Sequence, residues 1–401
     1  MPIVGGRDII SAKGERIIAM VGYAASLREK RIAATALFAS YVVMAFPDGI
    51  GVMSARFGLD GYASTLLFLW FAILPIAAGK LCGRMGGRLA VAISLASALP
   101  AFALLWRGTP QSAVVALGFA LAGISNVLLQ TTVPVWAAEM FGAARLSGLL
   151  TAGLFVKTVM AIGLPYAVFA LAQVGDWRHV FVALFIATAA SICLVWRSRI
   201  GIDAARAVRG GSVSIGSIFT VLKDRPTLLA AIAFAVAIVA DVAFNLSVPS
   251  AVPGRFDGGD MEIGLAYAVL FGVKLPVMLV GSMLFARKGV LPFLLPALLV
   301  AAAGACAMLL AGEFAAYLCG VALFAFGYAN IYGFVYGVAA PRHPGAMPGV
   351  SALLTMSIAG GALASPLVRV LAPCGARSTE SLVFALTVAL LGLFASIRRR
   401  I

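Results

Sequence analysis

The sequence predicts an all-α membrane protein with twelve transmembrane helices in two pseudo-symmetric six-helix bundles. Three observations predict this fold: the composition, a series of apolar runs of spanning length, and an echo between the two halves of the chain. Of the 401 residues, 62% are hydrophobic and 11% are charged, with a mean hydropathy of +1.05. A soluble domain carries roughly 25% charged residues to solvate its surface. Most of this chain is therefore expected to face lipid.

Apolar runs of about twenty residues are the signal for spanning helices. We place twelve of them at 33–55, 62–80, 88–106, 112–139, 144–171, 178–196, 227–250, 263–286, 290–311, 313–340, 347–371 and 379–397. The longest polar connection follows the sixth run. The predicted organisation is a cytoplasmic tail (1–32), a first bundle (33–196), a cytoplasmic linker (197–226) and a second bundle (227–401).

The basic residues predict the orientation. An even number of spans puts both termini on one side, and cytoplasmic loops carry an excess of Lys and Arg. With the N-terminus inside, most of the 30 Lys and Arg fall on the cytoplasmic side. The six that fall on the outer side are Arg56, Arg107, Arg178, Arg255, Arg369 and Arg377. The net charge of +15 is thus a topology signal of an inner-membrane protein with both termini cytoplasmic, and no nucleic-acid partner is expected.

Residues for metal or nucleophilic chemistry are sparse. The five cysteines are scattered without CxxC spacing, and the two histidines, His179 and His343, have no other plausible ligand nearby in the sequence. We expect no metal, no cofactor and no enzymatic activity. The sequence also lacks the GxxxxGK[ST] motif and the soluble domain that an ATP-driven pump needs.

The two halves repeat each other. GKLCGRMG (79–86) between spans 2 and 3 corresponds to SMLFARKG (282–289) between spans 8 and 9, and GISNV (123–127) corresponds to GYANI (327–331). Pro165 and Pro366, like Gly148 and Gly349, stand at a constant offset. Several coincidences at similar offsets indicate a duplicated six-helix unit, as in two-halved transporters.

These features resemble the major facilitator superfamily. The segments NVLLQTTVP (126–134), LTAGLFVK (150–157), GDWRHVF (175–181) and SALLTMSIAGGALASP (351–366) are similar to the branch that includes the proton-coupled L-fucose, galactose and glucose symporters. The resemblance implies that spans 1, 4, 7 and 10 line a central cavity and that spans 2, 5, 8 and 11 form the interface of the halves. Gly83 stands where the family's loop usually has Asp, and Val133 where this branch often has Asn before Pro134.

Four charges fall deep inside predicted spans: Asp48, Lys157, Asp241 and Lys274. A charge at mid-bilayer costs roughly 2.5–3.5 kcal/mol on insertion scales, so each is a candidate functional residue. We predict Asp48 and Asp241 as proton-coupling groups and the two lysines as substrate-binding residues. The lysines are alternatively structural partners of the aspartates.

Uncharged polar groups share faces with these charges. Asn126 and Gln130 lie four residues apart on span 4, as Asp241 and Asn245 do on span 7. Span 10 contributes Tyr328, Asn330 and Tyr332. We predict these as substrate-binding residues, because amide, phenol and carboxylate groups around a wet cavity hold small polar solutes. The predicted gating-loop residues of the repeated motif are Gly79, Arg84, Gly86, Arg287 and Gly289.

The predicted function is secondary active transport by alternating access, the proton-coupled movement of a small polar, sugar-like solute by a monomer. The choice of substrate class depends on the lysines. Two unpaired lysines about 8 Å apart would repel by roughly 2 kcal/mol at an effective dielectric near 20, so either the aspartates or a bound anion must offset them. The alternatives are an organic-anion transporter that uses Lys157 and Lys274, and a drug or metabolite exporter of the same fold.

Overall fold

The described part of the chain is helical throughout. The computed structural model describes residues 27–59, 61–141, 143–198, 215–343, 347–375 and 377–399. Residues 1–26 of the predicted N-terminal tail (1–32) and residues 199–214 of the predicted linker (197–226) lie outside the described part of the chain. The first half contains α2 (Leu27–Met44), η1 (Phe46–Gly49), α3 (Ile50–Phe57), α4 (Ala63–Phe68), η2 (Leu69–Ala72), α5 (Leu74–Met85), α6 (Gly87–Ala96), α7 (Ala98–Arg107), α8 (Ala113–Phe141), α9 (Ala143–Val174) and α10 (His179–Arg197).

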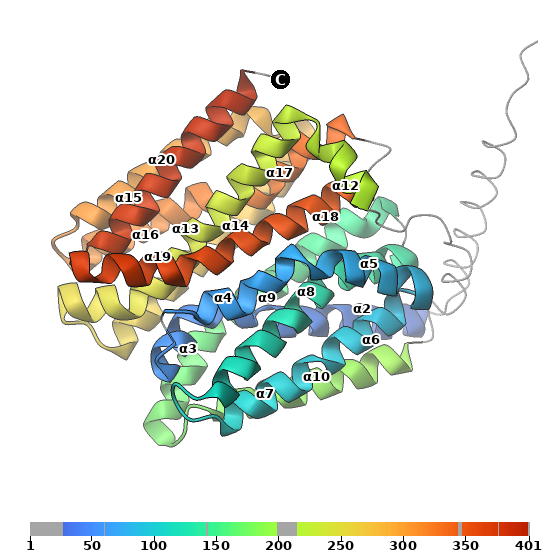
Figure 1. Ribbon diagram of the computed structural model, residues 1–401, viewed down its shortest axis with the longest axis horizontal. Coiled ribbons are helices and arrows are strands. Elements are labelled where there is room, and N and C mark those ends of the chain that lie inside the picture. The colour runs from blue at the N-terminus through green and yellow to red at the C-terminus, as the bar shows by residue number, and fades with distance from the viewer. Residues whose placement is uncertain are drawn as a thin grey trace, which may run out of the picture.

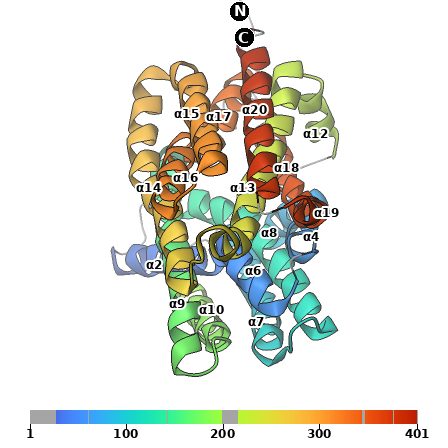
Figure 2. The same ribbon diagram turned by 90° about the vertical axis from the view of Figure 1, so that its left-hand side faces the viewer.

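The second half begins with a short helix inside the predicted linker. Its elements are α12 (Ile215–Leu222), α13 (Arg225–Phe256), α14 (Asp260–Lys288), α15 (Leu291–Leu310), α16 (Phe314–Tyr328), α17 (Ile331–Ala339), η3 (Ala340–Arg342), α18 (Met347–Ser357), η4 (Ile358–Leu363), α19 (Ala364–Leu371), η5 (Ala372–Cys374) and α20 (Ser378–Arg398). The two halves lie one above the other in Figures 1 and 2.

The predicted twelve-span fold is confirmed. Among the described residues, eleven helical segments are long and apolar enough to cross a membrane, and the bent pair Ala63–Ala72 and Leu74–Cys82 supplies a twelfth. The 53° bend of that pair lies at Ile73, just before Pro75 at the start of α5. Proline has no backbone N–H and cannot continue a preceding helix, which accounts for a break at this point.

The halves are joined firmly at one end of the molecule, which we call the closed end. There α3 packs on α13, and α4 packs on η4 and α19. At the opposite end, which we call the open end because fewer residues contact each other across the halves there, α18 of the second half packs on α5 and α8 of the first. Within their own halves, α2 packs on α8, α9 and α10, and α17 packs on α13 and α15. Helices α9 and α14 pack on each other between the halves.

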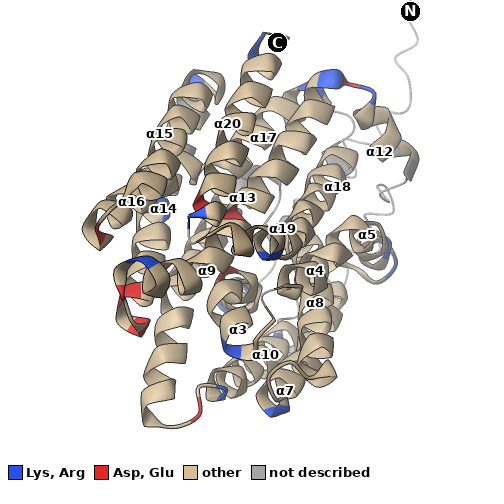
Figure 3. Ribbon diagram, turned by 60° about the vertical axis from the view of Figure 1, so that its left-hand side comes forward, with Lys and Arg blue, Asp and Glu red and all other residues tan. Residues whose placement is uncertain are grey.

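Charged residues gather at the ends of helices and in connections, and the middles of the helices are almost free of them in Figure 3. This distribution follows from the cost of a charge in hydrocarbon. The four charges predicted inside spans are therefore the main exceptions, and their surroundings define the candidate site.

Candidate transport site

The first ion pair lies at a break in span 1. Pro47 interrupts the helix, so the chain passes from α2 through the 3₁₀ turn η1 into α3, and Asp48 lies in that turn. Lys157 of α9 donates to Oδ1 of Asp48 at 3.1 Å. The two side chains are 19% and 22% exposed, so the pair is largely enclosed.

Asn126 supports the same break. The N–H of Asp48 bonds to the Ala45 carbonyl, so the carbonyl of Met44 does not receive the usual helical partner four residues on. Asn126 Nδ2 of α8 donates to that Met44 oxygen at 3.2 Å, and the Asn126 side chain is buried. An unpaired buried carbonyl is costly. The amide of Asn126 thus stabilises the turn that carries Asp48.

The second ion pair lies in the other half. Lys274 Nζ of α14 is 2.6 Å from Oδ1 of Asp241 on α13 and 5.3 Å from the centroid of the Phe271 ring. Tyr328 is buried next to it, and its hydroxyl donates to the carbonyl of Ala237 at 2.5 Å. Both predicted lysines therefore pair with the predicted aspartates.

Each pair is contained in its own half of the molecule. Asp48 and Lys157 come from spans 1 and 5, and Asp241 and Lys274 from spans 7 and 8. Asp48 lies within electrostatic reach of Asp241 and Lys274 as well as of Lys157. With both pairs formed, the cluster carries no net charge, and the repulsion expected between two unpaired lysines is offset by the aspartates.

Aromatic side chains of α13 and α17 form a cluster. Tyr332 of α17 is 46% exposed and meets Phe234 edge-on at 5.7 Å and Tyr336 at 4.6 Å between ring centroids. The Tyr336 hydroxyl donates to Ser351 Oγ at 3.2 Å. Of the span-10 tyrosines predicted to contact substrate, Tyr332 is accessible and Tyr328 is buried.

The remaining predicted polar residues differ in their surroundings. Asn330, between α16 and α17, donates to the Val277 carbonyl at 3.1 Å, as its repeat counterpart Asn126 does to Met44. Asn245 Nδ2 donates to the Asp241 carbonyl, and its buried Oδ1 has no partner among the described residues. Gln130 is half-buried on α8.

The two predicted gating loops have a similar backbone conformation at the glycine that follows each helix. Gly86 ends α5 with φ of +80°, and Gly289 ends α14 with φ of +72°. Glycine alone adopts such angles without strain. Gly79 and Arg84 belong to α5, and Arg84 is exposed in its last turn, while the Arg287 side chain lies outside the described residues. Both carboxylate oxygens of Glu139 accept from the N–H of Gly87 at the start of α6.

Sequence reasoning missed the contacts that join the closed end. Ser64 and Ser365 each donate a backbone N–H to the other's hydroxyl oxygen, at 3.0 and 2.8 Å. Thr65 Oγ1 donates to the Ala362 carbonyl at 2.7 Å, and Arg56 pairs with Asp260 at 2.7 Å. Serine and threonine are too common for any of these to stand out in the sequence. In the described part of the chain, no cluster of three or more potential metal ligands occurs.

Comparisons with known proteins agree on the fold. The sequence family described as the Major Facilitator Superfamily matches residues 31–366. No curated protein matches the chain. The E. coli fucose:proton symporter FucP superposes with a TM-score of 0.64 at 13% identity, over 92% of this chain and 98% of its own. The xylose transporter XylE from E. coli, in a partially occluded inward-open conformation, superposes with a TM-score of 0.67 at 15% identity, over 92% and 96%.

Proposed function

Since the chain belongs to the Major Facilitator Superfamily, we propose that it is a proton-coupled symporter of a neutral, polar, sugar-like solute. The observation that carries the substrate class is the neutral cluster: both lysines are paired with aspartates, so neither is free to hold an anion. The similar structures are those of FucP, a fucose:proton symporter, and XylE, a proton:xylose symporter, which supports the same class.

Partly accessible groups on spans 4 and 10 suit such a solute. The exposed Tyr332 offers an apolar ring face, and Tyr336 and Gln130 offer hydrogen-bonding groups. A pocket with aromatic walls and a few polar groups is the usual arrangement for holding a small polar molecule. The protein works as a monomer in the inner membrane, with its open end and both termini toward the cytoplasm.

Asp48 is the first candidate for the coupling proton, and Asp241 is the second. Protonation of Asp48 removes the negative partner of Lys157 and so changes the charge of the cluster. The Asp48 carboxylate lies in the turn between α2 and α3. Loss of its ion pair would therefore change the position of α3, the helix that packs on α13 at the closed end.

The test is transport in proteoliposomes. Asp48→Asn should abolish accumulation of solute against its gradient while exchange across the membrane continues. Asp257→Asn is the matched control, because Asp257 is exposed at the end of α13 in a left-handed conformation that Asn also adopts. Normal proton-dependent accumulation by Asp48→Asn would exclude Asp48 as the coupling group.

The substrate class is tested separately by thermal shift on purified protein with a panel of sugars and of organic acids. We expect stabilisation by a sugar or a similar neutral solute. Stabilisation by an organic acid that disappears in Lys157→Gln or Lys274→Gln would overturn the neutral class in favour of an organic anion.

A further inference from the structure

A cavity lies at the closed end of the C-terminal half, away from the ion pairs. Its volume is about 340 Å³, and it is lined by Arg255, Phe256, Ala311, Gly312, Cys374, Gly375 and Arg377. These residues come from the end of α13, the connection after α15 and the connection before α20. Nothing in the transport mechanism uses this cavity.

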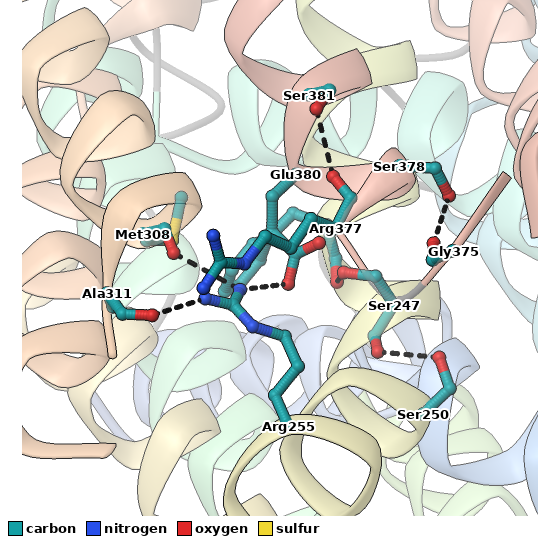
Figure 4. Close-up of polar contacts among 11 residues, drawn as sticks. Ser247, Ser250, Arg255, Met308, Ala311, Gly375, Arg377, Ser378, Glu380 and Ser381 are labelled. Atoms are coloured by element: carbon teal, nitrogen blue, oxygen red, sulfur yellow. Dashed lines mark hydrogen bonds and ion pairs between the residues drawn. The ribbon is translucent and has the colours of Figure 1, made fainter. Parts of the chain in front are cut away.

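Arg255 is a buried charge that reaches the cavity. Its side chain is 5% exposed and pairs at 2.9 Å with Glu380, which is 1% exposed. It also donates to the carbonyls of Met308 and Ala311 at 3.2 and 2.7 Å (Figure 4). A guanidinium has five N–H groups, and these contacts use three of them. Arg255 is therefore rigidly held and keeps donor capacity beside the cavity.

The charged side chains that line the cavity are both positive, Arg255 and Arg377, and no acidic residue is among the lining. Glu380 neutralises Arg255, but Arg377 forms no ion pair with any described residue and is exposed at the start of α20. Glu313, exposed at the start of α16, pairs with neither arginine in the described part of the chain. Among the lining residues, Arg377 therefore carries a charge without an ion-pair partner in the described part of the chain, and Arg255 is already held in place by Glu380.

We propose that this cavity binds a phosphate group, in addition to the transported solute. Guanidinium groups match phosphate geometry, because their N–H groups form paired bonds with its oxygens. The cavity lies where the spans end, at the level at which a bilayer has its headgroups. A phosphodiester of a lipid headgroup and free phosphate share this chemistry, and the volume accommodates either group.

Cys374 lines the cavity and is exposed, so its reactivity can report whether the cavity is occupied. An occupant should slow alkylation of Cys374 by N-ethylmaleimide, measured by mass spectrometry of the purified full-length chain. Cys319, exposed on α16 away from the lining, is the internal reference. Inorganic phosphate and a short-chain phosphatidylglycerol are the two probes, with sodium chloride at matched ionic strength as the control.

We expect a bound probe to slow the alkylation of Cys374 at least fivefold and to leave the alkylation of Cys319 unchanged. In Arg377→Gln, at least a tenfold higher probe concentration should be needed for the same slowing. Arg107→Gln is the matched control, since Arg107 is an exposed arginine at the end of α7 in the other half. Protection by the lipid at much lower concentration than phosphate identifies a headgroup site, and equal protection identifies a free-anion site. No protection by either probe, or equal protection in Arg377→Gln, overturns the proposal.

Discussion

The two halves approach each other closely at Gly51, which provides a sharp test of the closed end. Gly51 of α3 faces the backbone of Asn245 on α13, whose carbonyl oxygen accepts from the Tyr267 hydroxyl. A Cβ added at Gly51 would lie 2.7 Å from the Asn245 carbonyl carbon and closer still to its oxygen, whereas ordinary contact begins at 3.4 Å. The obstacle is backbone, which no rotamer change relieves.

Gly51→Ala should therefore separate α3 from α13 and destabilise the arrangement that is closed at this end. Overpacking costs about 1–3 kcal/mol, and we expect the upper part of that range because two backbones meet. Each 1.4 kcal/mol changes an equilibrium tenfold. The variant should favour opening of this end by about 100-fold and should lose most of its transport while remaining folded.

The assay is the distance between spin labels at positions 109 and 313, in a background without the five native cysteines, together with transport in proteoliposomes. The two positions lie at the closed end on opposite halves. Gly163→Ala is the matched control, because a Cβ at Gly163 meets no atom within 4 Å. Parental label distances and parental transport in Gly51→Ala would refute the reasoning.

Three further predictions concern the joints of the molecule. Ser365→Ala leaves the buried N–H of Ser64 without its acceptor, at a cost of about 1–3 kcal/mol. Spin labels at positions 109 and 313 should therefore move apart. Ser191→Ala is the control and should not change the label distance, because the Ser191 hydroxyl donates to Ala187 of its own helix. The bidentate contact with Arg342 holds the pKa of Asp224 well below its usual range. The resulting stability is present above the unfolded pKa of about 3.9 and is lost as the pH falls toward the depressed folded-state pKa. Because His343 Nε2 lies 3.6 Å from the same carboxylate, the comparison is made above the ordinary His pKa of about 6.5. Arg342→Gln should lower the free energy of unfolding equally at pH 7.5 and pH 8.5, by about 1 kcal/mol for this partly exposed pair, and unequal losses at the two pH values would contradict this. Reporter fusions at residue 210 and at the C-terminus should be active only as cytoplasmic reporters, and a periplasmic signal from either would refute the predicted orientation.

The spans could be predicted because each depends on the composition of one continuous segment. The four charges in the hydrocarbon were also predictable, since their cost singles out Asp48, Lys157, Asp241 and Lys274 in the sequence. The sequence left open whether the lysines pair with the aspartates or bind an anion, because pairing depends on how helices distant in the chain face each other. Asp48 and Lys157, for example, are 109 residues apart. The Ser64–Ser365 contact was not predictable at all, since two serines on separate spans carry no signal of their partnership.

The positions of the ion pairs suggest how a proton and the closed end are connected. Asp48 lies in η1, and Gly51 follows in the first turn of α3. Asp241 lies one turn from Asn245 on α13, and Asn245 provides the backbone against which Gly51 packs. Each aspartate is thus within one turn of the contact that closes the molecule. Because both ion pairs are internal to a half, rocking of the halves need not break them. Under the coupling hypothesis, protonation of an aspartate would alter its ion pair and, through the same helix turn, the fit of α3 against α13. The coupling hypothesis and the Gly51 prediction therefore bear on one local structure, and a variant at Gly51 should disturb closure without changing either ion pair.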